Sequence, residues 1–180
     1  MALDLAKSAD ALLNVKGMTT YFDITGGVLG TPQARVHAVE DISFHIKPGE
    51  TLAMVGESGC GKSTTGRTLI GLEKATRGQI EFDGKDLTKM SRSERKASIT
   101  QMQMIFQDPY SSLNPRQTVG TSISEPMIVH KVMPKADIKP TVVGLLKKVG
   151  LGEEHYDRFP HEFSGGQRQR ICIARALGLT

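Results

Sequence analysis

The stretch Val55-Gly56-Glu57-Ser58-Gly59-Cys60-Gly61-Lys62-Ser63-Thr64 decides the fold of this chain. It fits the phosphate-binding loop pattern G-x-x-x-x-G-K-[ST], in which closely spaced glycines let backbone N–H groups surround an anion. The residues before it, Glu50 to Val55, predict a buried strand, and Lys62 to Leu72 predict a helix closed by Gly71. Strand, glycine-rich loop and helix in this order aim a helix N-terminus at a phosphate. The stretch therefore predicts a nucleotide site.

Each residue type in the loop has a physical role. Glycine is needed because a side chain would hold the backbone away from the phosphates or forbid a positive φ. Lys62 would reach the β- and γ-phosphates, and the Ser63 hydroxyl would bind Mg²⁺. The predicted binding residues of the loop are Gly56, Ser58, Gly59, Cys60, Gly61, Lys62, Ser63 and Thr64.

Composition limits the remaining function classes. The chain has 180 residues and a formal charge of +4, without a basic patch interleaved with aromatic residues, which argues against a nucleic-acid partner. Cys60 and Cys172 have no metal-ligand spacing, and neither do the five histidines, so we expect reduced thiols and no structural metal. No apolar run approaches the ~20 residues that cross a bilayer, so membrane attachment would come through a partner.

The rest of the chain predicts two kinds of structure. Strands are expected at Leu12–Thr19, from Val39 to Ile46, and at Gln79–Phe82, where Asp83-Gly84 signals a hairpin. A further strand, Ile99–Phe106, should stop before Asp108-Pro109. Helices are expected at Ser91–Ser98, Val119–Val129 and Ile138–Val149. The pattern thus predicts a small antiparallel unit beside a parallel core, followed by helices.

A second glycine-rich helix start occurs at His161–Arg170. Ser164 and Gln167 form a capping box, so one interpretation is an ordinary helix start with glycines before it. The other interpretation is a second anion-binding surface, since free N–H groups flanked by glycine bind anions. The phosphate-binding loop in the same chain favours the second. Arg168 and Arg170 are expected on the solvated face of this helix, with contact to phosphate or a partner as the alternative.

These motifs together resemble those of ATP-binding cassette (ABC) proteins. Gly56–Thr64 is similar to the family's Walker A loop, and Phe163–Gln167 to its signature motif, with Phe163 in place of the usual Leu. Phe106–Pro109 stands where the family's Q-loop is expected. The amino-acid sequences of the loop and of Phe106–Pro115 look most like those of the ATP-binding subunits of bacterial oligopeptide/dipeptide importers. The resemblance runs from about Leu12 to the end of the chain.

The resemblance implies an α/β fold: a P-loop NTPase of ABC type, with a parallel core sheet, an N-terminal antiparallel β subdomain and a helical subdomain. Residues 1–180 would be a partial nucleotide-binding domain. Residues of about 12–109 would form the β subdomain and P-loop core, and residues of about 110–180 the helical subdomain with the signature motif. The family's Walker B strand, catalytic Glu and switch His follow the signature helix. We therefore expect a partial chain that lacks the C-terminal strands of the sheet and is inactive alone.

The resemblance also implies the ligands and their contacts. Lys62, Ser63, Thr64 and the loop amides would hold ATP and Mg²⁺, and Gln107 would contact the Mg²⁺ and the attacking water, so that Lys62 and Gln107 are the implied catalytic residues. Phe22, or as second choice Tyr21, would stack on adenine, against the alternative of plain strand-end packing. The implied contacts to ATP on the facing subunit are Ser164, Gly165, Gly166 and Gln167.

The implied partners are a second ABC ATP-binding subunit, identical or related, the transmembrane permease subunits and, indirectly, an extracytoplasmic peptide-binding protein. The chain would then lie at the cytoplasmic face of the membrane and couple ATP hydrolysis to uptake of peptides. Two alternatives remain open. One is a soluble, non-transport ABC ATPase that acts on ribosomes or DNA, and the other is a non-catalytic nucleotide-binding module.

Overall fold

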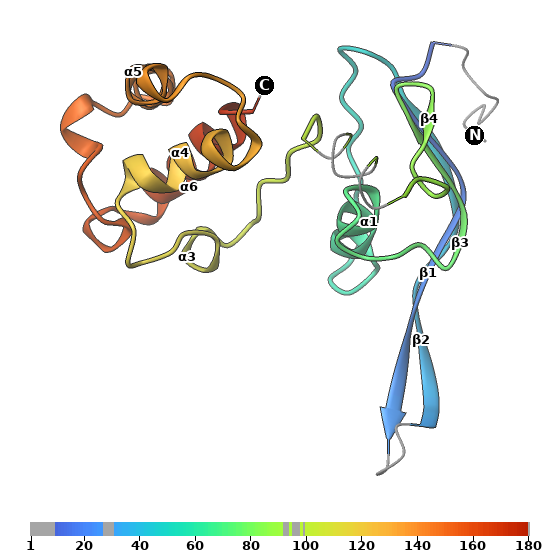
Figure 1. Ribbon diagram of the computed structural model, residues 1–180. Coiled ribbons are helices and arrows are strands. Elements are labelled where there is room, and N and C mark those ends of the chain that lie inside the picture. Colours follow the sequence, from blue (N-terminus) through green and yellow to red (C-terminus); the bar gives the residue numbers. More distant parts are fainter. Residues whose placement is uncertain (1–9, 27–30, 92–93, 95–97, 99, 180) are drawn as a thin grey trace. The chain divides into compact units, whose positions relative to one another are not determined.

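The computed structural model describes residues 10–26, 31–91, 94, 98 and 100–179. The chain divides into two compact units, Met1–Ile99 and Thr100–Thr180 (Figure 1). In the first unit, the elements whose bounds are described are four strands and one helix. The second unit consists of helices. None of the helices in the described part of the chain combines the length and apolarity needed to cross a bilayer.

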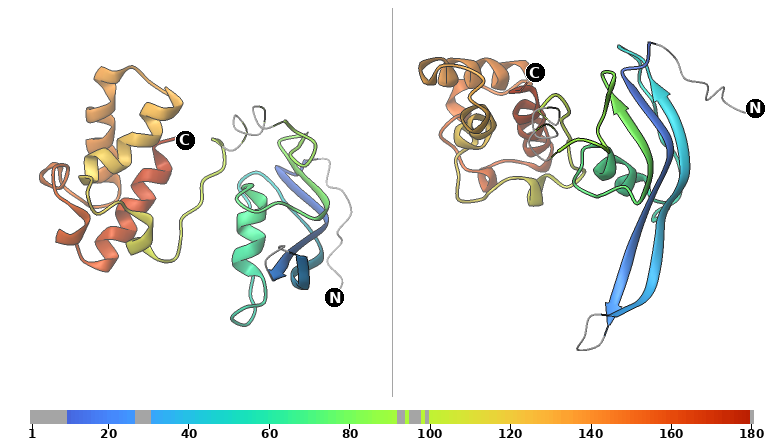
Figure 2. Two further views of the ribbon diagram at one scale, coloured as in Figure 1. Left: turned by 60° about the horizontal axis from the view of Figure 1, so that its bottom comes forward. Right: turned by 45° about the vertical axis from the view of Figure 1, so that its right-hand side comes forward.

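The first unit contains a four-stranded antiparallel sheet in the order β2-β1-β3-β4. Its strands are β1 (Leu13–Gly26), β2 (Thr31–Ile46), β3 (Arg77–Phe82) and β4 (Lys85–Asp86). The three strands expected in this region are confirmed, and β1 and β2 are longer than predicted. Figure 2 shows these two strands continuing beyond β3 and β4 as a two-stranded ribbon. The antiparallel unit expected from the sequence is therefore present.

The β3–β4 turn follows the sequence closely. Asp83 and Gly84 have φ values of 48° and 70°. Positive φ at both central residues is the geometry of a type I′ turn, whose twist matches that of the flanking strands. The hairpin predicted from Asp83-Gly84 is confirmed.

Helix α1 (Lys62–Leu69) packs on this sheet through small hydroxyl side chains. Thr20 of β1 and Thr68 of α1 are buried, and their Oγ1 atoms lie 3.1 Å apart in a hydrogen bond. The helix was expected to reach Leu72 but ends at Leu69. Gly71 closes it with a φ of 76°, as the sequence indicated.

Two of the predicted strands are wrong. Glu50–Val55 is not a strand, and neither are the described residues of Ile99–Phe106, namely 100–106. Val55 is 92% exposed, and Leu52, Met54 and Ile105 are exposed as well. A strand of a parallel sheet takes its backbone hydrogen bonds from segments distant in sequence. The described sheet is antiparallel throughout and offers neither segment a partner, so the predicted parallel core sheet is not seen among the described residues.

The second unit is built from α3 (Pro109–Ser112), α4 (Val119–His130), α5 (Lys135–Lys148) and α6 (Gly165–Leu177), with the 3₁₀ turns η1 (Glu153–His155) and η2 (Pro160–Glu162). Figure 1 shows α4, α5 and α6 clustered together. They bury one apolar core to which each contributes, and its largest fully buried side chains are Ile123, Met127, Leu146 and Ile171. The two helices predicted at 119–129 and 138–149 are confirmed.

Three details of the helices differ from the expectations or extend them. α5 begins before Ile138, so that Pro140 lies in its second turn. Most of the predicted helix Ser91–Ser98 lies outside the described residues, but its capping box is present: the Ser91 N–H donates to Glu94 Oε2 over 2.9 Å. The short helix α3 was not predicted, although Asp108 followed by Pro109 is a helix-start signal.

Candidate nucleotide-binding site

The glycine-rich loop before α1 depends on glycine at its last position. Gly61 has a φ of 92°, and a Cβ atom added there would lie 2.2 Å from the carbonyl oxygen of Ala38. Ala38 is the extra residue of a bulge in β2, since Thr20 pairs with Val39 while Tyr21 pairs with His37. Both the backbone conformation and the close approach to β2 therefore exclude a side chain at Gly61.

The loop leaves the start of α1 without a side-chain cap. The N-cap residue is Gly61, no side-chain cap hydrogen bond is found among the described residues, and the first turn contains no acidic residue. These amides carry the positive end of the helix dipole. A phosphate fits such a helix start because it supplies the missing acceptor and the compensating charge.

Lys62 adds a full positive charge at the same place. Its Nζ donates to the carbonyl oxygens of Gly56 and Glu57 over 2.7 and 2.6 Å, and it lies 3.4 Å from Cys60 Sγ. Its neighbours Ser58, Gly59, Cys60 and Ser63 are exposed. The loop thus brings together an ammonium group, backbone amides and hydroxyls, which is the donor set that a triphosphate and Mg²⁺ require.

Phe22 and Tyr21 lie on β1 and have different surroundings. The Tyr21 hydroxyl donates to Glu40 Oε1 over 2.7 Å, and the Tyr21 ring lies 4.1 Å from the His37 ring. The bond to Glu40 raises the pKa of Tyr21 and lowers that of Glu40. Phe22 is 37% exposed and lies two residues from Thr20, on the side of the strand that packs on α1. This geometry favours Phe22 over Tyr21 as the adenine-stacking residue.

The second glycine-rich start, at α6, has the capping box predicted from the sequence. Ser164 Oγ accepts from the Gln167 N–H over 3.3 Å, and Gln167 Oε1 accepts from the Ser164 N–H over 3.0 Å. Gly165 and Gly166 are exposed, and Cβ atoms added there would meet nothing within 4 Å. The fold itself therefore leaves room for side chains at both glycines.

Gln107 is exposed and directly precedes the cap of α3. Asp108 accepts hydrogen bonds from the N–H groups of Tyr110 and Ser111 over 2.9 and 3.3 Å. These bonds, that of Tyr110 foremost, lower the pKa of Asp108. The capped helix fixes the backbone that follows Gln107. Gln107 and Ser164–Gln167 belong to the second unit, whereas the glycine-rich loop and Phe22 belong to the first.

Arg168 was predicted on a solvated helix face, and this prediction is wrong. The structure also shows a partner of Arg168, Tyr110, that the sequence interpretation missed. Arg168 is only 8% exposed; its Nε donates to the Pro160 carbonyl oxygen over 2.7 Å, and its guanidinium lies 3.9 Å from the centre of the Tyr110 ring. Arg170 is exposed as expected and donates to the carbonyl oxygens of Val149 and Gly150. The burial of Arg168 depends on the unpredicted helix α3, which places Tyr110 over it.

The histidines and cysteines do not form a metal centre in the part of the chain that the structure describes, where no group of three or more His, Cys, Asp or Glu residues could hold an ion. Cys60 and Cys172 are free thiols, one exposed and one buried. Burial raises the pKa of the Cys172 thiol.

A family model described as "ABC transporter" matches residues 39–179, which include both glycine-rich helix starts and Gln107. The chain belongs to the ABC transporter family. Its resemblance to that family, drawn from the Walker A, Q-loop and signature motifs, is therefore confirmed.

Curated relatives give a narrower likeness. The chain is 52% identical over 171 residues to the glutathione import ATP-binding protein GsiA of Pectobacterium atrosepticum, a match that covers 95% of this chain and 27% of that protein. It is 52% identical over 170 residues to GsiA of Escherichia coli K12, covering 94% of this chain and again 27% of the relative. The chain thus spans about a quarter of the length of these curated relatives.

Solved structures show the same fold. A dimeric, post-hydrolysis state of the ATP-binding cassette MJ0796, bound to ADP and Pi, matches with a TM-score of 0.77 and 26% identity over 92% of this chain and 69% of that chain. CbiO1 from Clostridium perfringens, part of the ABC transporter complex cbiONQ, matches with a TM-score of 0.74 and 30% identity over 94% and 62% of the two chains. The ABC-type P-loop fold class is confirmed.

Proposed function

We propose that this chain is ATP-binding machinery of an ABC importer, and that ATP and Mg²⁺ bind at the loop Gly56–Thr64. The observation that carries the proposal is the start of α1. Its first turn has no side-chain cap, and the Lys62 ammonium lies beside it on the loop carbonyls of Gly56 and Glu57. A triphosphate supplies what this arrangement lacks, which is an acceptor with negative charge.

The roles of the other loop residues follow from their positions. The amides from Gly59 to Lys62 would contact phosphate oxygens, and the hydroxyls of Ser63 and Thr64 lie at the helix start, where Ser63 would bind Mg²⁺. Lys62 would exchange bonds to its own loop for bonds to the β- and γ-phosphates. Phe22 would stack on adenine, since its ring is part exposed while that of Tyr21 is engaged by Glu40 and His37.

The second glycine-rich start would serve a facing subunit. Ser164, Gly165 and Gly166 are exposed, and the Cβ positions of both glycines are open, so a nucleotide held by another cassette can approach the backbone closely. Gln107 would contact the Mg²⁺ and the attacking water and would link the site to a transmembrane partner. A structural neighbour, the cassette MJ0796, was solved as a dimer bound to ADP and Pi, which supports the pairing of two cassettes.

The proposed solute rests on the names of curated relatives and on the resemblance of the sequence to peptide importers. Both curated relatives described above are named as glutathione import proteins. Glutathione is a small peptide, which agrees with the resemblance of this sequence to peptide importers. We propose uptake of a small peptide or peptide-like solute through membrane permease subunits, with the chain at the cytoplasmic face. The permease and an extracytoplasmic binding protein, rather than this chain, would choose the solute.

Titration calorimetry with ATP tests the nucleotide site. The wild-type chain should bind, and Lys62→Ala should abolish binding because the triphosphate loses its main cation. Lys74→Ala is the matched control, since Lys74 is an exposed lysine of the same unit outside the loop. Unchanged affinity in Lys62→Ala, or equal losses in both variants, would refute the site.

A further inference from the structure

Two arginines of α6 hold the short helix α3. The Arg168 guanidinium lies 3.9 Å from the centre of the Tyr110 ring, at the start of α3. Arg175 Nη1 donates to the Ser112 carbonyl oxygen over 2.6 Å, at the end of α3. The two arginines lie two helical turns apart on α6. Helix α3 is therefore fixed to α6 at both of its ends.

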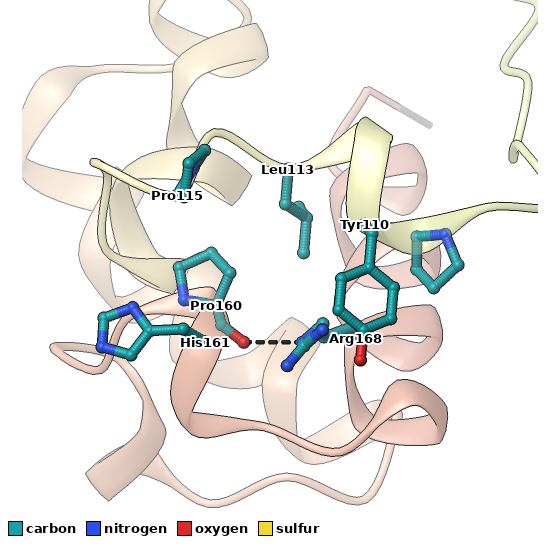
Figure 3. Close-up of a pocket in the computed structure, with 7 residues that line it drawn as sticks. Tyr110, Leu113, Pro115, Pro160, His161 and Arg168 are labelled. Carbon is teal, nitrogen blue, oxygen red and sulfur yellow. Dashed lines mark hydrogen bonds between the residues drawn. The ribbon is translucent and has the colours of Figure 1, made fainter.

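Arg168 is buried in this contact, whereas Tyr110 is 66% exposed and covers it from the solvent side. Figure 3 shows its guanidinium beside the Tyr110 ring, with its bond to the Pro160 carbonyl. Leu113, Pro115 and Pro160 line the same small cavity of about 110 Å³. No salt bridge to Arg168 is found among the described residues, so the ring and the carbonyl carry the compensation for its buried charge. A cation over an aromatic face is attracted by the electron-rich face of the ring, also at a partly exposed site.

The location of this contact links two parts of the proposed reaction centre. Tyr110 follows Gln107 by three residues, and the Asp108 cap binds the intervening backbone through the N–H groups of Tyr110 and Ser111. Arg168 follows Ser164 by one helical turn and lies on the helix whose first residues are Gly165 and Gly166. A continuous series of contacts therefore joins the segment after Gln107 to the exposed surface Ser164–Gly166: the Asp108 cap, the Tyr110–Arg168 stack and the first turn of α6.

We propose that Arg168 and Tyr110 are positioning residues that make the segment after Gln107 and the start of α6 move as one body. This inference rests on the proposed function. A displacement at Gln107 then reaches Ser164–Gly166 through the stacked pair, and the facing subunit's nucleotide is engaged only when Gln107 is in place. Neither side chain contacts the nucleotide, so their loss affects turnover while ATP binding at the loop Gly56–Thr64 is retained.

The test is ATP turnover by the full-length protein that contains this chain, in complex with its transporter partners. Arg168→Met keeps the length and apolar packing of the side chain and removes its charge and its bond. We expect kcat to fall by about tenfold, within the range of measured couplings, while the KM for ATP stays within about twofold. Arg168→Lys, which keeps the cation over the ring, should recover part of the loss. Tyr110→Phe should match the wild type, and Tyr110→Leu should match Arg168→Met.

Arg170→Met is the matched control, since it makes the same change two residues away, on an exposed arginine that contacts the end of α5 and not α3. Its kcat should stay at the wild-type value. Circular dichroism in the assay buffer gives the unfolded fraction of each variant. A kcat that falls only in proportion to that fraction, or falls equally in Arg170→Met, would overturn the inference.

The outcomes separate the two proposals. A wild-type chain that binds no ATP overturns the proposed function and this inference with it. A wild type that turns over ATP, with Arg168→Met and Tyr110→Leu at wild-type kcat, overturns the inference alone. Loss of kcat in both variants with ATP binding intact supports both.

Discussion

Two helices of this protein start after glycine-rich turns, and their glycines are present for different reasons. At α1, Gly61 has a positive φ and packs against the Ala38 carbonyl, so the fold itself requires glycine. At α6, Gly165 and Gly166 face open space. The start of α1 has no side-chain cap, whereas that of α6 is capped by Ser164 and Gln167. The start of α1 thus lacks a hydrogen-bond acceptor for its N–H groups, and the start of α6 offers a surface without crowding side chains.

This difference separates a glycine that shapes a binding loop from a glycine that admits a partner. An uncapped helix start gains from an external anion, which is the condition for holding a ligand within the subunit. At a capped helix start, the side-chain cap already accepts a first-turn N–H hydrogen bond. The glycines of α6 therefore make the backbone accessible to a partner rather than create a need for an anion. We infer that α1 serves the chain's own nucleotide and that α6 serves a nucleotide presented by another copy or a related chain.

The largest effect should come from alanine substitutions at the two starts. Gly61→Ala should abolish ATP binding and lower the free energy of unfolding by roughly 1–3 kcal/mol through backbone strain alone. Gly165→Ala should leave ATP binding intact and change stability by no more than about 1 kcal/mol, since a helical alanine is favoured there. Calorimetry and thermal unfolding give both quantities. Equal behaviour of the two variants would erase the distinction.

The next effect concerns pairing. Ser164→Arg should weaken ATP-dependent association with a partner cassette by about 100-fold or more, because a bulky side chain then occupies the open surface. Its ATP binding as a monomer should stay unchanged. Ser164→Ala is the control: it removes the cap and costs about 1 kcal/mol of stability without blocking the surface. Normal dimer formation by Ser164→Arg in size-exclusion chromatography would contradict the assignment of α6.

The smallest effect concerns a helix start that is capped by a carboxylate. The hydrogen bond from the Tyr110 N–H, followed by those from Ser111, holds the pKa of Asp108 below its ordinary value. The folded state therefore favours the ionised group, and its stabilisation is complete above the unfolded pKa of about 3.9 and is lost as the pH falls through the folded pKa. Asp108→Asn should remove this pH dependence while it keeps a capping side chain.

Thermal unfolding of the wild type and Asp108→Asn as a function of pH checks this. The difference between their Tm values should be constant near neutral pH and change only on acidification below about pH 4. A difference that is the same at all pH values would show that the charge of Asp108 does not contribute to the α3 cap.

Local signals in the sequence predicted much of the fold and of the candidate site. The capping box of Ser164 and Gln167, the Asp83-Gly84 turn, and the helix start after Gly61 all depend on residues within a few positions of one another. The Asp108-Pro109 start of α3 was also local and could have been predicted from the same rules. Short-range hydrogen bonds and φ preferences depend on residues that are neighbours in the chain, so the sequence alone determines them.

Tertiary structure alone decided the remaining features. The predicted strands at residues 50–55 and 99–106 failed in their described residues, because strand formation depends on a distant partner and not on the apolar run. Arg168 was expected in solvent and is buried under Tyr110, 58 positions earlier in the chain. The need for glycine at Gly61 comes in part from the bulge at Ala38. Each depends on which distant segments meet, and packing rather than local preference determines that.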